Sequence, residues 1–183
     1  MKFKVIFLLI TLPISLTIAK EKALIKNGDF QKKSSWEIDK GKYVKNKKGN
    51  GFIVLYGQKE PNLLSQKIDL PPGDYIINFK IKGKVHTQML PRVFTGPLRA
   101  FGHSQNSFAS LEVFGYFSDG KKWANATARI KVKKRHRYLV LALKAPPNFK
   151  KPYYMLFDDF VVLKDKNPPK PHKSNDGFDD FEE

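Results

Sequence analysis

The residues best suited to bind a ligand lie between positions 123 and 133, in the stretch WANATARIKVK. Small or apolar side chains occupy every second position from Ala124 to Val132, and larger polar or aromatic side chains lie between them. This alternation is typical of a β-strand that buries one face and exposes the other. The exposed face would carry five side chains with binding chemistry: Trp123, Asn125, Thr127, Arg129 and Lys131.

These side chains have the chemistry that recognises carbohydrate. An indole ring packs on the C–H face of a sugar, while amide, hydroxyl and guanidinium groups hydrogen-bond to its hydroxyls. Tyr116 on the preceding predicted strand and Arg92 in a long loop could complete the set. Trp123 also has a structural alternative, which is to fill one end of a β-sandwich.

The cationic part of the same face needs its own explanation. Arg129, Lys131 and Lys133 place three like charges along one pleated face, where they repel one another. An anionic ligand, such as a sulfated or uronic-acid polysaccharide, would relieve this repulsion. The alternative is that the charges protect an exposed sheet edge from pairing with another chain.

The sequence offers no convincing set of catalytic residues. Asp158 and Asp159 are adjacent in a predicted strand, so they should point to opposite faces and form no carboxylate pair for glycoside hydrolysis. No glycine-rich phosphate loop is present. The four histidines show no metal-ligand spacing: His86, His103, His136 and His172. We therefore do not expect an enzyme.

Residues 1–19 have the pattern of a secretory signal peptide. Lys2 and Lys4 precede an apolar run from Val5 to Ile18, and small residues up to Ala19 suit a cleavage site. We expect export, either to the periplasm or cell envelope or out of the cell; the alternative is an uncleaved membrane anchor. The chain has no cysteine, so no disulfide supports the exported domain.

The chain is strongly basic, with a formal net charge of +17. Between Gly120 and Phe157 there are eleven lysines and arginines and no acidic residue. Such a field favours anionic partners: acidic polysaccharide, lipid headgroups at a membrane surface, or nucleic acid, against which export argues. The alternative is a lysine-rich composition that only keeps the protein soluble.

Residues 20–164 are expected to form one antiparallel β-sandwich. Short apolar or alternating runs are separated by turn signals, and none has a helical period. We expect residues 40–51 to be an exposed loop and residues 123–143 to be a hairpin with a basic turn. Residues 165–183 are proline-rich and then acidic, which predicts a disordered tail. The predicted strands are 51–56, 64–70, 75–82, 92–95, 111–117, 123–132, 138–143 and 153–163.

Four segments in order resemble the galactose-binding-like jelly rolls, which include carbohydrate-binding modules of families 4, 9 and 22. They are LIKNGDF with Trp36, LLSQKIDLPPGDYIINFKIKG, DGKKW and YMLFDDFVVL, and together they cover Leu24 to Leu163. The resemblance implies a two-sheet jelly roll that binds glycans without catalysis. The step from fold to carbohydrate is an analogy, because this fold hosts many functions.

The resemblance also implies a structural calcium ion, held partly by Gln31 and Asp158. Gln31 departs from the family pattern, in which a glutamate stands at this position. An amide oxygen can ligate calcium but brings no charge. Lys32 and Lys33 make the local field less favourable for a cation.

Taken together, the sequence predicts an exported, non-catalytic carbohydrate-binding protein with a preference for acidic polysaccharides. The alternative is a structural or adaptor protein of the cell envelope. In that case the basic face would contact membrane or cell wall, and the acidic tail would recruit another protein.

Overall fold

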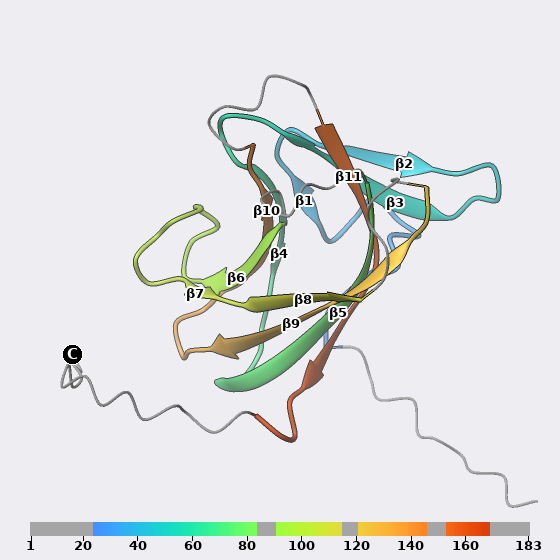
Figure 1. Cartoon of the computed structure of the whole chain (residues 1–183). Coiled ribbons are helices and arrows are strands. Elements are labelled where there is room, and N and C mark those ends of the chain that lie inside the picture. Colours follow the sequence, from blue (N-terminus) through green and yellow to red (C-terminus); the bar gives the residue numbers. More distant parts are fainter. Residues whose placement is uncertain (1–23, 84–90, 115–120, 146–152, 169–183) are drawn as a thin grey trace, which may run out of the picture.

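The chain folds into two antiparallel β-sheets packed face to face, as the computed structural model shows for residues 24–83, 91–114, 121–145 and 153–168 (Figure 1). The five-stranded sheet has the order β1 (Glu37–Ile38), β4 (Asn62–Lys67), β10 (Tyr138–Leu143), β6 (Arg92–Gly96) and β7 (Ser107–Phe108). The six-stranded sheet has the order β2 (Lys42–Lys45), β3 (Gly51–Gly57), β11 (Tyr153–Lys164), β5 (Gly73–Gly83), β9 (Ala124–Val132) and β8 (Ser110–Phe114). The predicted β-sandwich is confirmed.

The core lies between the two sheets and follows the alternation seen in the sequence. Strand β9 buries every second side chain, from Ala124 to Val132, and exposes Asn125, Arg129 and Lys131. Facing side chains such as Leu141 of β10 fill the space from the other sheet. Each fully buried large apolar side chain contributes about 1.5–3 kcal/mol, so packing can stabilise the domain without disulfides.

The predicted hairpin 123–143 is wrong, although both of its strands exist. Strand β9 pairs with β5 and β8 in one sheet, whereas β10 pairs with β4 and β6 in the other. Residues 133–137 therefore cross from one sheet to the other. Buried His136 anchors this crossing, because its Nδ1 lies 2.8 Å from Oγ1 of Thr95 on β6. The all-apolar β10 is covered on both faces, as predicted, since Phe94 and Phe101 pack on its outer side.

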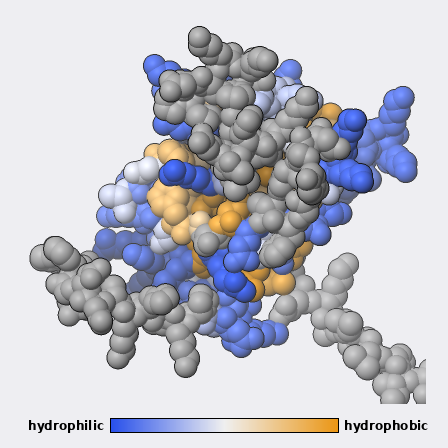
Figure 2. Space-filling model, in the orientation of Figure 1, coloured by the Kyte–Doolittle hydropathy of each residue, from blue (hydrophilic) through white to orange (hydrophobic). Residues whose placement is uncertain are grey.

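Residues 40–51 are not a simple loop, because strand β2 forms a hairpin with β3. The turn is built around Asn46, whose Oδ1 accepts the N–H groups of Lys48 (2.8 Å) and Asn50 (3.1 Å). Gly49 adopts φ +84°, which favours glycine. The hairpin surface is hydrophilic at the right of Figure 2. The sequence did not indicate strand β2, because a short edge strand rich in lysine has little hydrophobic alternation.

Strand β11 contains a β-bulge that the sequence reading missed. Asp158 pairs with Lys80 of β5, but the next pair is Val161 with Asn78, so β11 has an extra residue here. Asp159 is in the left-handed region of backbone conformation, with φ 51°, and this accommodates the bulge. As a result Phe157 and Phe160 both point into the core, and both aspartates lie on the outer side. The expectation that Asp158 and Asp159 face opposite ways is therefore wrong.

The N-terminal motif LIKNGDF holds this bulge in place. The Phe160 N–H donates to the Gly28 carbonyl at 2.8 Å, and a Cβ on Gly28 would lie only 1.8 Å from the Phe160 oxygen. Trp36 is buried beside this contact, 5.3 Å from the Phe160 ring, and its Nε1–H donates to the Asn27 carbonyl at 3.0 Å. Trp36 is thus a core residue, and Gly28 allows the close backbone approach.

Two predictions about the ends of the chain lie outside the described residues. These are the signal peptide, 1–19, and most of the acidic tail, of which the structure describes only 165–168. In the part of the chain that is described, no helix is long and apolar enough to cross a membrane.

Replacing Gly28 by alanine should destabilise the fold. The added methyl group cannot fit against the Phe160 carbonyl, so we expect G28A to lower the free energy of unfolding by about 2 kcal/mol or more. Urea unfolding followed by circular dichroism measures this. S34A, in the same segment but exposed, should change stability by less than about 0.5 kcal/mol. Equal stability of G28A and wild type would show that the Gly28–Phe160 approach is not a constraint.

Candidate functional site

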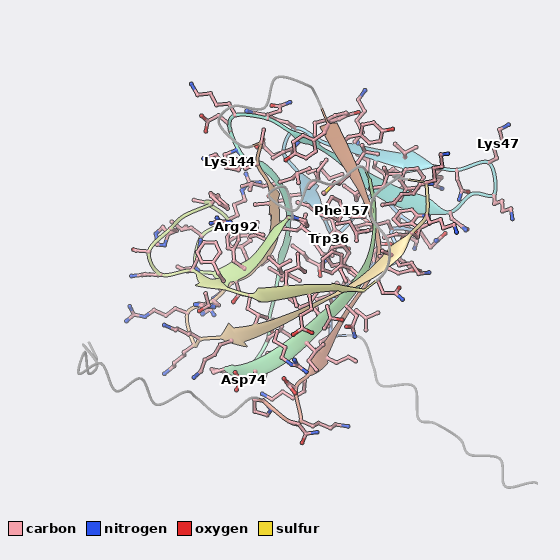
Figure 3. All side chains as sticks on the ribbon, in the orientation of Figure 1. Trp36, Lys47, Asp74, Arg92, Lys144 and Phe157 are labelled. Atoms are coloured by element: carbon pink, nitrogen blue, oxygen red, sulfur yellow. The ribbon has the colours of Figure 1, made fainter. Side chains whose placement is uncertain are left out.

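The structure brings together only part of the predicted site. Trp123 and the alternate residues of β9, Asn125 to Lys131, lie on the outer face of the six-stranded sheet. Arg92 does not join them. It lies on the outer face of the other sheet, with its guanidinium 5.6 Å from the Phe101 ring centre, and Figure 3 shows it and Lys47 on opposite sides of the molecule. Tyr116 lies outside the described residues.

The cationic end of this row has acidic partners of its own. Arg129 lies 3.5 Å from the buried Asp165 carboxylate and 3.7 Å from Glu112 of β8. Lys131 is in register with Asp74 of β5. These contacts explain Arg129 without any ligand. Protection of an edge is not needed either, because β8 covers this side of β9.

A cavity of about 650 Å³ opens at the other end of the row, around Trp123. Five separate segments supply its walls: the turn after Gly28, the β2–β3 hairpin, β5, β11 and the residue before β9. We call it the Trp123 cavity. Its lining residues are Asp29, Gln31, Asn46, Asn50, Phe52, Lys80, Lys82, Trp123, Leu156, Asp158 and Asp159.

The aromatic wall of the Trp123 cavity is solvent-accessible. The Trp123 side chain is 39% exposed and meets Phe52 edge-on, with ring centres 6.3 Å apart. Trp123 therefore does not fill the end of the sandwich, which was the structural alternative. An indole held by a neighbouring ring and open on one side can receive an apolar ligand face.

A smaller cavity of about 300 Å³ continues the Trp123 cavity along the sheet, since Lys80 and Asp159 line both. Asn125 and Thr127 line this second space, and the Thr127 hydroxyl donates to Oδ1 of Asn78 at 2.9 Å. The middle of the β9 row is thereby joined to the Trp123 cavity, whereas its cationic end is not.

The Trp123 cavity contains an ion pair and one carboxyl group with a strongly shifted pKa. The Lys80 ammonium lies 2.6 Å from the Asp159 carboxylate, and this hydrogen bond raises the pKa of Lys80. Burial raises the pKa of the neighbouring Asp158 to about 6, helped by Asp159 and Asp29 and opposed by Lys80 and the Asp159 N–H. A carboxyl group that changes protonation near neutral pH is characteristic of functional sites.

The predicted calcium ligands both line the Trp123 cavity, but their surroundings do not suit a cation. The Gln31 amide nitrogen donates to the Asp29 carbonyl, and the Lys80 ammonium occupies the Asp159 carboxylate. Among the described residues there is no cluster of three acidic or histidine side chains that could hold a metal. Calcium binding remains a prediction.

The sequence reading missed the polar half of the Trp123 cavity, which comes mainly from β5 and β11. Lys80 and Asp159 carry its ion pair, and Phe52 supports the indole. One signal was available. In F-D-D-F two aromatic residues stand three apart, which a regular strand cannot bury together, so the motif itself indicates a bulge.

The comparisons with known proteins give a likeness of fold. No protein-family model matches the chain, and no curated protein sequence does. Among solved structures, the TmCBM61 complex with beta-1,4-galactotriose is 18% identical, covering 79% of this chain and 99% of that one, with a TM-score of 0.48. The family 11 carbohydrate-binding module of the cellulase Lic26A-Cel5E of Clostridium thermocellum is 15% identical, covering 79% and 95%, with a TM-score of 0.44.

The raised pKa of Asp158 predicts a pH-dependent effect of D158N on stability. The folded chain binds this proton at about pH 6, the unfolded chain only near the ordinary value of 3.8. Protonation therefore stabilises the fold fully below pH 3.8, and the stabilisation is lost as pH rises through about 6. D158N, neutral throughout, should be more stable than wild type at about pH 8 and nearly equal to it at about pH 4.

Urea unfolding at both pH values measures this difference. D159N is the comparison variant: it removes the repulsion between Asp159 and Asp158 but also the ion pair with Lys80, so it should bring a smaller gain at high pH than D158N. A D158N variant that is no more stable than wild type at high pH would contradict the proposed desolvation of Asp158.

Proposed function

We propose that the protein binds carbohydrate without catalysis and holds a sugar unit in the Trp123 cavity. The observation that carries the proposal is the meeting of an exposed indole with carboxylates, amides and ammonium groups in one open cavity. Sugars need this combination, since they present an apolar C–H face and a rim of hydroxyls. The sugar-binding modules among the similar folds agree with this proposal.

Each wall has a distinct part in such binding. The Trp123 ring would receive the apolar face of the sugar. Asp158 and Asp159 accept hydrogen bonds from hydroxyls, whereas Lys82 donates them. The Lys80–Asp159 ion pair holds the polar wall in place before binding, and a preorganised wall loses less entropy when the ligand arrives.

The position of the carboxylates argues for binding and against hydrolysis. Asp158 has a raised pKa and Asp159 is paired with Lys80, which resembles the unequal carboxyls of glycosidases. Hydrolysis, however, needs two carboxyls that flank the glycosidic bond. Asp158 and Asp159 are neighbours on one bulge and form one wall of the cavity. They can contact one side of a sugar, where they serve recognition.

A preference for acidic polysaccharides would come from the rim and not from the cavity. The cavity lining has three aspartates against two lysines, so it would not attract a carboxylate or sulfate group. The β2–β3 hairpin beside it carries exposed Lys45, Lys47 and Lys48, and Figure 3 shows Lys47 at its tip. Anionic groups elsewhere on a bound chain could contact these lysines, within the screening length of about 8 Å at physiological salt.

Export belongs to the same proposal. A signal peptide at residues 1–19 would place the protein in the envelope or outside the cell, where polysaccharide occurs. N-terminal sequencing of the protein recovered from its native compartment tests this, with Lys20 as the expected first residue.

Truncating Trp123 should abolish most sugar binding. On an array of neutral and acidic glycans, W123A should lose about tenfold or more in affinity, since a lost stacking contact costs about 1.5 kcal/mol. Y154A is the matched control. Tyr154 is 56% exposed on the same sheet but does not line the cavity, so its removal should have little effect.

Two results would overturn the proposal. One is an unchanged glycan profile for W123A. The other is binding of wild type to any polyanion with no sugar selectivity and complete loss in high salt, which would favour the envelope-adaptor alternative.

The hairpin lysines should affect only acidic glycans. The variant K47Q/K48Q should bind an acidic chain about three- to tenfold more weakly at low salt and a neutral one unchanged, because only the former contacts the rim. K133Q/K134Q is the control with the same net charge, placed on the distant sheet crossing. An equal loss in both variants would show that total charge, and not this rim, decides the preference.

A further inference from the structure

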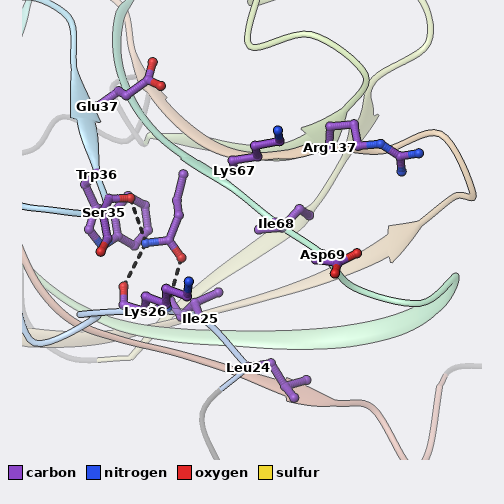
Figure 4. A pocket seen from close by; sticks show the side chains of 11 residues that line it. Leu24, Ile25, Lys26, Ser35, Trp36, Glu37, Lys67, Ile68, Asp69 and Arg137 are labelled. Carbon is purple, nitrogen blue, oxygen red and sulfur yellow. Dashed lines mark hydrogen bonds between the residues drawn. The ribbon is translucent and has the colours of Figure 1, made fainter.

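A second cavity, of about 890 Å³, lies at the end of the sandwich where the N-terminal segment crosses β11 (Figure 4). Its apolar lining comes from Leu24, which is 43% exposed, and from the buried residues Ile25, Trp36 and Ile68. Its polar lining includes three cations, Lys26, Lys67 and Arg137. We call it the Arg137 cavity. It is separate from the Trp123 cavity and shares no lining residue with it.

The walls of the Arg137 cavity are fixed by internal hydrogen bonds. Buried Gln66 joins both sides, because its Oε1 accepts the Lys26 N–H at 3.1 Å and its amide donates to the carbonyls of Lys26 (2.8 Å) and Ser35 (3.0 Å). The Ile68 N–H donates to the Arg137 carbonyl at 2.7 Å. The cavity is therefore a built feature and not a gap between loose segments.

The positive charge of the Arg137 cavity is not neutralised by the residues that line it. Lys26, Lys67 and Arg137 form no ion pair with any carboxylate of the described residues. Glu37 at the rim is bound by Arg99, which leaves Asp69 as the remaining acidic group. An apolar lining beside excess positive charge suits a ligand with negative charge and apolar side chains.

We propose that the Arg137 cavity binds an acidic, phenylalanine-containing peptide, and that its occupant is the C-terminal segment of this same chain. Residues 174–183, SNDGFDDFEE, hold five acidic residues and two phenylalanines. Phe178 and Phe181 would contact the apolar lining, and the carboxylates around them would pair with the three cations.

Strand β11, which precedes the C-terminal segment, has its last residues near this cavity. The Leu24 N–H, at the cavity, donates to the Val162 carbonyl of β11 at 3.2 Å. The Lys164 ammonium reaches the Pro72 carbonyl at 3.4 Å, in the turn that follows Asp69. Phe178 lies ten positions after Pro168, and such a link spans up to about 33 Å, roughly the width of a domain of this size.

Because the link between the domain and the C-terminal segment is short, this segment can occupy the cavity even if it binds weakly. A tethered peptide has a local concentration in the millimolar range, so it can occupy its site without high intrinsic affinity. The bound tail would cover three cations that otherwise attract anionic ligands.

Hydrogen–deuterium exchange of the mature chain tests the proposal. The amides of Leu24, Lys26 and Ile68 lie in the cavity walls and are direct probes. In a chain that ends at Lys173 they should exchange roughly tenfold faster, as expected if the tail is bound nine-tenths of the time. The peptide 174–183 added in excess should restore the protection, and the full-length variant F178A/F181A should behave like the shortened chain.

Reversing the charge of two cavity residues gives a second test of the proposal. K67E/R137E in the full-length chain should remove the tail-dependent protection, whereas K42E/K45E, the same change on β2, should keep it. In the chain that ends at Lys173, K42E/K45E should still bind the free peptide and K67E/R137E should not, and circular dichroism shows whether each is folded.

Three results would overturn the proposal. The first is equal exchange at these amides with and without the tail. The second is tail-dependent protection confined to residues 131–135, which would place the tail on the sheet crossing. The third is protection that rises with protein concentration, which would assign the cavity to the tail of a second copy.

Discussion

The bulge in β11 links the packing of the core to the geometry of the candidate site. Phe157 and Phe160 stand three residues apart, yet both must enter the core, where each contributes about 2–3 kcal/mol. One extra residue in β11 lets both rings enter the core. The Gly28 carbonyl accepts the Phe160 N–H at the point where the pairing of β11 with β5 is interrupted. The same irregularity turns Asp158 and Asp159 to the outer side, beside Trp123. The demand of the core thus creates the polar wall of the candidate site.

Positive and negative groups are grouped locally in the structure, and the net charge of +17 does not show this grouping. Asp158 is held in a half-buried place that raises its pKa, which costs stability at neutral pH. Such a cost is typical of a residue retained for binding. Arg129, by contrast, is neutralised by Asp165 and Glu112 and serves the fold. The proposed binding in the Trp123 cavity therefore does not depend on the basic row of β9.

Local patterns were enough to predict most of the longer strands, because burial of a strand face is a local property. Alternation identified β5 and β9, and continuous apolar runs identified β3 and β10, whereas the short strands β1, β2 and β7 were not predicted. Pairing was not predictable in the same way: the crossing at 133–137 resembles a hairpin turn until His136 is known to be buried. In the site, Trp123 stood out by its type, whereas Lys80 and Asp159 looked like ordinary strand residues. Only the register between β5 and β11 brings them to the indole.

An NMR titration of the isotopically labelled mature chain with the best oligosaccharide from the array would locate the binding site. If the sugar binds in the Trp123 cavity, the largest shifts will occur at the Trp123 indole N–H and at the amides of Phe52, Lys80 and Asp159, which surround one cavity. Shifts centred on Arg129 to Val132, with the indole signal unmoved, would contradict binding in this cavity.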